Sequence, residues 1–581
     1  EGRSTAAPLP PAIASRLSTI SYRLLAIGYR LSPISYRLSP TGFPATMGDD
    51  SSSQGQGEQV MLTPFQNEPF GNFDSDNRRA AMQRAIRHVA GQQGASYPLV
   101  IGGERIVTDR KLPSINPAEP KKVVGYASSA SQEQAHQAVL AADAAFRAWS
   151  RVPVSARAQV LLRAAAIMRR RKEELAAWMM HEVSKNWVEA DADVAEAIDF
   201  CEWYARQALA LQGERQPLVP YPGEYNELRY IPLGPGLAIP PWNFPLAIAT
   251  TLTVAPIVVG NTVVLKPSPR APVMANLLVQ ILEEAGLPPG VVNLVTGEDA
   301  VIGDFLVDHP LVRFIGFTGS KTIGLRIQQR AAVRQPGQNW LKRAILEMGG
   351  KDAIIVDETA DLEAAASGIV VSAFGFQGQK CSACSRAIVV DQVYDQVLQR
   401  VAEKAKALRL GNPTKPETDM GAVIDQRAFD TISQYIAIGQ EEGRLVTGGE
   451  VIDHELVKDG GFFIQPTIFA DVQPHARIAQ EEIFGPVLAF IRAANFDEAL
   501  AIANDTEYGL TGGLYSRNLE RLERAREEFH VGNLYFNRKC TGALVGVQPF
   551  GGFNMSGTDS KAGGSDYLRL FTQPKVISER F

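Results

Sequence analysis

Apolar and polar positions follow helical and strand periods from about Leu62 to the end of the chain. An alanine-rich amphipathic segment predicts a helix over residues 131–149, with Ser131 as its N-cap. Two more helices and then an extended segment are expected at residues 155–183, 187–212 and 217–230. The first part of the globular region is therefore predicted to be mainly helical.

Short apolar segments alternate with helical patterns from Ile231 onward. Four strands are expected at residues 236–239, 262–265, 291–295 and 312–317, with helices between them such as 274–284. A second alternating series begins at Ala353 and continues to about residue 545. Apolar strands that alternate with helices predict an α/β fold with a doubly wound parallel sheet.

Composition excludes several classes of function. The 581 residues carry a net charge of −5, so no basic surface for nucleic acid is indicated. Four cysteines are too few for a disulfide framework and indicate a reducing compartment. The longest uncharged stretch, residues 231–265, holds six prolines and is not expected to span a membrane.

Residues 1–61 differ in character from the rest and are expected to be a low-complexity, disordered extension. A Tyr-Arg-Leu motif recurs with a period of seven from Ser21, and no acid lies between Gly2 and Gly48. Residues 1–46 therefore resemble a transit peptide, which would place the protein in the mitochondrial matrix. The alternative is a translated repeat upstream of a start at Met47; it is favoured because transit peptides are not usually tandem repeats, and it predicts a cytoplasmic protein.

Cys381 lies in a setting that suits a nucleophile. It follows an apolar segment and Gly378, in a run of small residues where the backbone can approach a ligand closely. Most cysteines are simply buried, so the setting matters. Cys384 completes a C-x-x-C pair, but the further ligands of a zinc site are missing and no metal is expected. Cys384 is either a resolving thiol or a small buried residue, and the second interpretation is favoured.

Four other motifs suit chemistry around this cysteine. They offer an amide in an apolar loop, a strand–turn–helix for phosphate, a carboxylate before two glycines, and an acid beside an aromatic residue. They are Pro241-Trp242-Asn243-Phe244-Pro245, Phe317-Thr318-Gly319-Ser320, Leu346-Glu347-Met348-Gly349-Gly350 and Glu481-Glu482-Ile483-Phe484.

Together, the five motifs resemble the aldehyde dehydrogenase superfamily over nearly all of residues 62–581. Within it, the chain is most similar to the branch that acts on L-glutamate γ-semialdehyde, the open form of 1-pyrroline-5-carboxylate. The residues that carry this closer resemblance are 375–382, 530–539 and 541–552.

The resemblance implies a Rossmann-type NAD-binding domain formed by residues 62–207 and 228–346, and an α/β catalytic domain at 347–545. It also implies a small oligomerisation flap from residues 208–227 and 562–581, and hence a homo-oligomer.

The resemblance also implies the chemistry. Cys381 attacks the aldehyde, Asn243 and the Cys381 backbone N–H bind the oxyanion, and Glu347 activates water against the thioester. The product is L-glutamate, in the second step of proline degradation, with proline dehydrogenase as a separate chain. The alternatives are another carboxylated semialdehyde as substrate, or a catalytically silent member of the family.

NAD is the expected cofactor. The residues that the resemblance assigns to it are Lys266 and Ser268 at the adenosine ribose, Gly319 and Ser320 at the pyrophosphate, Glu482 and Phe484 at the nicotinamide ribose, and Pro241 and Trp242. Pro269 stands where many members of the family have an acid for the ribose 2′-hydroxyl, which leaves NADP use open.

The substrate carboxylate is expected to bind Ser382 and the backbone N–H groups near Gly542 and Ala543. Phe244 and Phe550 are expected to flank the aliphatic chain. Lys380 is interpreted either as a solvated side chain or as an electrostatic aid to carboxylate binding. Glu189 and Glu196 are expected to be solvated.

Overall fold

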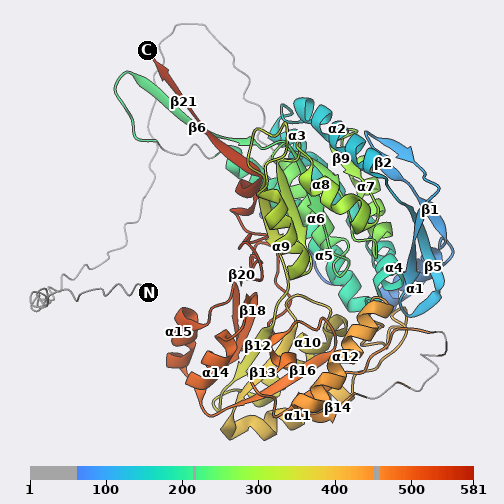
Figure 1. Ribbon diagram of the computed structural model, residues 1–581, viewed down its shortest axis with the longest axis vertical. Coiled ribbons are helices and arrows are strands. Elements are labelled where there is room, and N and C mark those ends of the chain that lie inside the picture. Colours follow the sequence, from blue (N-terminus) through green and yellow to red (C-terminus); the bar gives the residue numbers. More distant parts are fainter. Residues whose placement is uncertain (1–61, 214–217, 450–451, 453–457, 459) are drawn as a thin grey trace, which may run out of the picture. The chain divides into compact units, whose positions relative to one another are not determined.

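The computed structural model describes residues 62–213, 218–449, 452, 458 and 460–581 (Figure 1). The expected extension at 1–61, with its repeat, lies outside the described residues. Within them, no helix combines the length and the apolar character needed to cross a membrane.

The N-terminal helices confirm most of the predicted pattern. They are α1 (Asp76–Ala90), α2 (Gln132–Trp149), α3 (Val154–Arg170), α4 (Lys172–Val183) and α5 (Trp187–Gly213). Ser131 caps α2 in a capping box: its Oγ accepts from the Gln134 N–H, and the Gln134 side chain accepts from the Ser131 N–H.

The single helix expected over 155–183 is wrong, because the structure has two helices that break at Arg171. The sequence around the break carries a physical reason. Arg169 and Arg170 lie in the last turn of α3, and Glu173 and Glu174 lie in the first turn of α4. Cations stabilise a helix C-terminus and anions stabilise an N-terminus, so this charge order favours an end followed by a new start.

The first large sheet has seven strands in the order β11-β10-β7-β8-β9-β2-β3. Its parallel strands are β7 (Pro235–Ile239), β8 (Thr262–Leu265), β9 (Val292–Leu294), β10 (Phe314–Thr318) and β11 (Arg343–Glu347). The antiparallel edge is β2 (Leu99–Ile101) and β3 (Glu104–Ile106). Helices α6 (Ala247–Val258), α7 (Pro272–Glu284), α8 (Asp304–Asp308) and α9 (Lys321–Ala331) connect its strands.

The strand order reverses at β7. The chain runs outward from β7 through β8 to β9, and then returns to place β10 and β11 on the other side of β7. The predicted doubly wound sheet is thus confirmed. In such sheets, ligands bind outside the carboxyl ends of the strands at the point of reversal.

The second large sheet also has seven strands, in the order β14-β15-β16-β13-β12-β18-β19. They are β12 (Asp352–Val356), β13 (Cys384–Val390), β14 (Arg444–Thr447), β15 (Thr467–Ala470), β16 (Val487–Ala493), β18 (Thr511–Tyr515) and β19 (Asn533–Phe536), and β14 alone pairs antiparallel. Its helices are α10 (Leu362–Phe374), α11 (Tyr394–Lys406), α12 (Gln426–Glu442), α14 (Phe496–Asn504) and α15 (Leu519–Glu528).

Smaller sheets complete the fold. One contains β1 (Ala95–Tyr97), β5 (Glu119–Ser128) and β4 (Lys111–Asn116), and another pairs β17 (Tyr508–Gly509) with β20 (Phe553–Asn554). A third is an antiparallel ribbon of β6 (Glu224–Pro232) and β21 (Thr572–Arg580), which extends away from the helices in Figure 1. We call this the terminal ribbon.

Candidate active site

Cys381 lies between the end of α10 and the start of β13, on a tightly wound backbone. Phe376, Gln377 and Gly378 have φ angles of 49°, 58° and 68°, in the left-handed region that non-glycine residues rarely adopt. The Gln377 amide offsets this strain by donating to the Ser184 and Ala422 carbonyls, at 3.2 and 2.8 Å. Such strain is found where a functional group must be held in one place.

The link from β11 to β12 packs directly against this loop. A Cβ on Gly350 would lie closer than 3.0 Å to the Cys381 carbonyl oxygen, and a Cβ on Gly349 would lie as close to the Glu482 carboxylate. The Gly350 N–H donates to Glu482 Oε1 at 3.0 Å. The two glycines therefore bring the cysteine motif and the Glu482 motif together.

The Cys381 thiol is partly exposed, unlike the other three cysteines, which are buried. Desolvation raises the pKa of this thiol, and the negative charges of Asp352, Glu347 and Glu482 raise it further. Because the thiolate is the reactive form, a cationic group that arrived beside Cys381 would promote its attack.

Glu347 ends β11 and lies near enough to Cys381 for its charge to act on the thiol. Its Oε1 accepts from the Ser560 hydroxyl at 2.5 Å, and its buried Oε2 has no partner among the described residues. Burial raises the pKa of this carboxyl to about 7, although the Ser560 hydrogen bond opposes the rise. A carboxylate whose pKa is close to 7 and that has one free oxygen can act as a general base.

Asn243 follows β7 and is 4% exposed. One hydrogen of its amide binds the Gln379 carbonyl oxygen at 3.1 Å, beside the cysteine loop. Trp242 packs edge-on against the rings of Phe376 and Phe484, with ring centroids 6.3 and 5.7 Å apart. The Asn243 motif, the cysteine loop and the Phe484 loop therefore meet at one place.

Four of the residues expected to hold the cofactor lie at the carboxyl ends of β8 and β10, the two strands that flank β7. Lys266 and Ser268 follow β8, and Gly319 and Ser320 follow β10. Ser320 is the N-cap of α9 but makes no capping hydrogen bond through its side chain. The Ile323 N–H is bonded to the Ser320 carbonyl, but the N–H groups of Lys321 and Thr322 have no partner among the described residues and are left for an anion, which fits a cofactor pyrophosphate.

The predicted substrate residues lie on two segments. Ser382 is buried beside the nucleophile, and Gly542 and Ala543 lie in a loop after β19. Their backbone N–H groups make no hydrogen bond within the described residues, while Arg538 holds the loop through the Thr541 and Gly542 carbonyls. This role of Arg538 was not expected from the sequence.

Glu189 and Glu196 are not solvated, so that expectation is wrong. Lys380 Nζ binds Glu189 Oε1 at 2.6 Å, and the two side chains are 11% and 19% exposed. Burial alone would raise the pKa of Glu189, but Lys380 and Lys185 hold it below its ordinary value. Burial and Asp193 raise the pKa of Glu196 to about 8. The two acids lie seven positions apart and so share one face of α5, a helix that also carries Asp191, Asp193, Asp199 and Glu202.

Lys185 is completely buried in the same region. Its Nζ binds Asp193 at 2.7 Å and lies 3.9 Å from the centre of the Phe244 ring. The Phe244 ring therefore lies next to a buried ion pair, Lys185 with Asp193, which was not expected from the sequence.

Cys384 lies in the core of the second sheet and is 1% exposed. Its thiol donates to the Arg386 carbonyl, and buried Cys540 belongs to the same core. This environment favours the space-filling role over that of a resolving thiol for Cys381. Among the described residues, no cluster of side chains could hold a metal ion.

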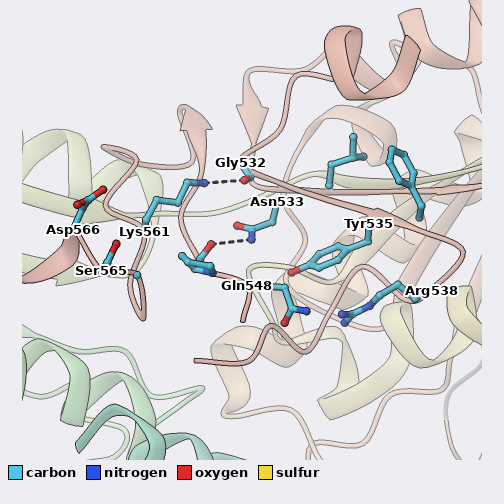
Figure 2. Close-up of a pocket in the computed structure, with 12 residues that line it drawn as sticks. Gly532, Asn533, Tyr535, Arg538, Gln548, Lys561, Ser565 and Asp566 are labelled. Atoms are coloured by element: carbon cyan, nitrogen blue, oxygen red, sulfur yellow. Dashed lines mark hydrogen bonds between the residues drawn. The ribbon is translucent and has the colours of Figure 1, made fainter. Parts of the chain in front are cut away.

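A cavity of about 600 Å³ lies beside edge strand β19 (Figure 2). Its wall includes Arg538, Gln548 and the β19 residue Tyr535. The Tyr535 hydroxyl is buried with no partner among the described residues. Cys381, Glu347 and Asn243 do not line this cavity.

Comparison with known proteins shows the family to which the chain belongs. The model of the aldehyde dehydrogenase family matches residues 106–577, and the chain belongs to that family. Proteins named 1-pyrroline-5-carboxylate dehydrogenase from Geobacillus thermodenitrificans and Geobacillus kaustophilus are 59% and 60% identical over 521 residues, which cover 90% of this chain and 100% of each relative.

Solved structures of the same family have a similar fold. The structure of 1-pyrroline-5-carboxylate dehydrogenase from Thermus with bound NAD is 54% identical, with a TM-score of 0.88, and the match covers 90% of this chain and 100% of that one. Proline utilization A from Bdellovibrio bacteriovorus is 44% identical, with a TM-score of 0.87, over 90% of this chain and 54% of that one.

The titration of Glu347 gives a testable pH dependence. Because only the carboxylate accepts a proton, we expect the rate of the step it assists to rise with pH and to level off above about pH 7. Ser560→Ala removes a hydrogen bond that lowers this pKa, so the rising limb should move to higher pH by roughly one unit. Single-turnover rates measured from pH 5 to 9 check this; an unmoved limb would mean that Glu347 does not set it.

Proposed function

We propose that this chain oxidises L-glutamate γ-semialdehyde, the open form of 1-pyrroline-5-carboxylate, to L-glutamate with NAD. The observation that carries the proposal is that Asn243 and Glu347 both lie next to the Cys381 loop: the Asn243 amide binds the Gln379 carbonyl, and the charge of Glu347 acts on the Cys381 thiol. The relatives and solved structures above, which carry the name of this enzyme, support it.

The first step is attack by Cys381. A bond forms between its sulfur and the aldehyde carbon, and the carbonyl electron pair moves to oxygen. The oxyanion accepts hydrogen bonds from the Asn243 amide and from the Cys381 backbone N–H, which are preorganised donors. Asn243 can do this because only one of its amide hydrogens is held by Gln379.

When bound, NAD supplies the hydride acceptor that turns the thiohemiacetal into a thioester. Lys266 and Ser268 would hold its adenosine ribose, Gly319 and Ser320 its pyrophosphate, and Glu482 its nicotinamide ribose. Trp242 and Phe484 would exclude water from the nicotinamide end, with Pro241 shaping the turn after β7.

Glu347 completes the reaction as a general base. It takes a proton from water as the water oxygen bonds to the thioester carbon, and the bond from carbon to sulfur then breaks. The products are a carboxylate and a Cys381 thiolate, and the enzyme returns to its starting state once Glu347 has released its proton to solvent. The free Oε2 of Glu347 is the oxygen that can receive this proton.

The carboxylate at the far end of the substrate would bind Ser382 and the N–H groups of Gly542 and Ala543. Arg538 contributes indirectly, because its bonds to two loop carbonyls turn the amides the other way. Phe244 and Phe550 would flank the aliphatic chain. Proline dehydrogenase, which would supply 1-pyrroline-5-carboxylate, is proposed to be a separate chain.

We also propose that the chain forms a homo-oligomer through the terminal ribbon. A two-stranded ribbon is marginally stable by itself, and exposed strand edges invite pairing. The ribbon and its continuation expose Tyr225, Val576 and Phe581. In this scheme, residues 62–207 and 228–346 bind the cofactor, residues 347–545 carry the chemistry, and residues 208–227 and 562–581 bridge the copies.

The two chemical steps can be separated. Glu347→Gln should give a burst of reduced cofactor followed by slow turnover, because hydride transfer precedes hydrolysis. Cys381→Ala should abolish both phases, and Cys384→Ala is the matched thiol control that should keep them. Stopped-flow absorbance checks all three variants. Full steady-state activity in Cys381→Ala would refute the mechanism.

Ser382→Ala tests how the substrate is recognised. The loss of a hydrogen bond to the substrate carboxylate should weaken kcat/KM for the semialdehyde by about 1–3 kcal/mol. A simple aliphatic aldehyde lacks that carboxylate and should be nearly unaffected. Equal losses for the two substrates would show that Ser382 supports the loop without contacting the substrate.

The proposed interface at the terminal ribbon can be tested by introducing a charged side chain. Val576→Asp should shift the protein toward monomer in sedimentation velocity, because it buries a carboxylate in the proposed interface. Val107→Asp is the control, since these two valines are 63% and 64% exposed and Val107 lies outside the ribbon. An unchanged oligomer in Val576→Asp would place the interface elsewhere.

A further inference from the structure

The predicted adenosine ribose site holds an acid that the motif analysis did not assign. Pro269 occupies the position where many members of the family carry a carboxylate for the ribose 2′-hydroxyl. In the structure, Lys266 Nζ forms an ion pair with Asp299 Oδ1. Position 269 thus has no carboxylate, but the carboxylate of Asp299, from a different part of the chain, lies beside Lys266.

The sheet topology explains how the two residues meet. Lys266 follows β8, and Asp299 begins a short helical turn, η1 (Asp299–Gly303), that comes after β9. These strands are parallel neighbours with Leu265 opposite Leu294, so both residues lie beyond the carboxyl edge of the sheet. This edge is where a doubly wound sheet binds its ligand.

The two side chains differ in exposure. The Lys266 side chain is 2% exposed, whereas that of Asp299 is 67% exposed. Asp299 Oδ2 has no partner among the described residues, so this oxygen is available to accept a hydrogen bond. Lys266 fixes one oxygen of the carboxylate and leaves the other facing outward.

Other nearby charges are already engaged. Glu298, the residue before Asp299, forms an ion pair with Arg110. Arg270, which could have attracted a phosphate near Ser268, forms an ion pair with Asp425. The Lys266 charge is balanced by Asp299, so a ribose 2′-phosphate would meet no unpaired cation from Lys266, Arg270 or Arg110.

We propose that Asp299 selects NAD over NADP: its carboxylate accepts a hydrogen bond from the adenosine ribose 2′-hydroxyl and repels a 2′-phosphate. The inference rests on the proposed cofactor site and adds to it a residue that sets specificity. Asp299 thereby takes the role that Pro269 cannot fill.

Equilibrium binding to the full chain without aldehyde tests the proposal. By isothermal titration calorimetry, Asp299→Asn should weaken NAD by about tenfold and tighten NADP, so that the ratio of the two Kd values changes by roughly ten- to a hundredfold. Asp395→Asn on α11 is the matched control: it removes an exposed carboxylate whose partner Arg492 keeps Asp391, so the ratio should stay unchanged. Adenosine 5′-monophosphate and adenosine 2′,5′-bisphosphate should repeat the same contrast.

Hydrogen exchange separates failure of this proposal from failure of the cofactor site. In the wild-type protein, NAD should protect amides in residues 265–270 and 299–303. Protection there with an unchanged Kd ratio in Asp299→Asn would overturn the role of Asp299 and keep the site. If NAD protects neither segment, both the role and the site are wrong.

Discussion

The whole site depends on the close approach of two backbone segments at Gly349 and Gly350. Any side chain at Gly350 would collide with the Cys381 carbonyl, and any side chain at Gly349 would collide with the Glu482 carboxylate. The same short link joins β11, the last strand of the first sheet, to β12 in the second sheet. It therefore brings Glu347 close to the nucleophile loop, which the pairing of Asp352 with Cys384 holds beside β12.

This approach also sets the electrostatics. Asp352 is buried and Glu347 and Glu482 are half-buried, and desolvation raises the pKa of each carboxyl. The same negative surroundings raise the pKa of the Cys381 thiol. The surroundings of Cys381 thus favour a cationic group. Oxidised nicotinamide is such a group, because it carries a positive charge. Because the pKa of Glu347 is about 7, this carboxyl can act as a base at physiological pH.

The sequence predicted what depends on local pattern and on short motifs. The alternating strands, the doubly wound sheet and the cap at Ser131 all follow from nearest neighbours along the chain. The break at Arg171 was missed because an apolar period continues through it, although the order of charges marked it. The pairs Lys380–Glu189 and Lys266–Asp299, and the hold of Arg538 on its loop, could not be predicted. The two ion pairs join residues 191 and 33 positions apart, and all three contacts depend on how the folded backbone is arranged.

The central claim is that Cys381 carries the oxidised substrate as a γ-glutamyl thioester, which water hydrolyses with Glu347 as the base. The most direct measurement is peptide mass spectrometry of the Glu347→Gln protein, quenched in acid after mixing with NAD and 1-pyrroline-5-carboxylate. The account predicts a glutamyl adduct on the peptide that contains Cys381, located at that sulfur and absent from Cys384. An adduct on another residue, or none while reduced cofactor forms, would contradict it.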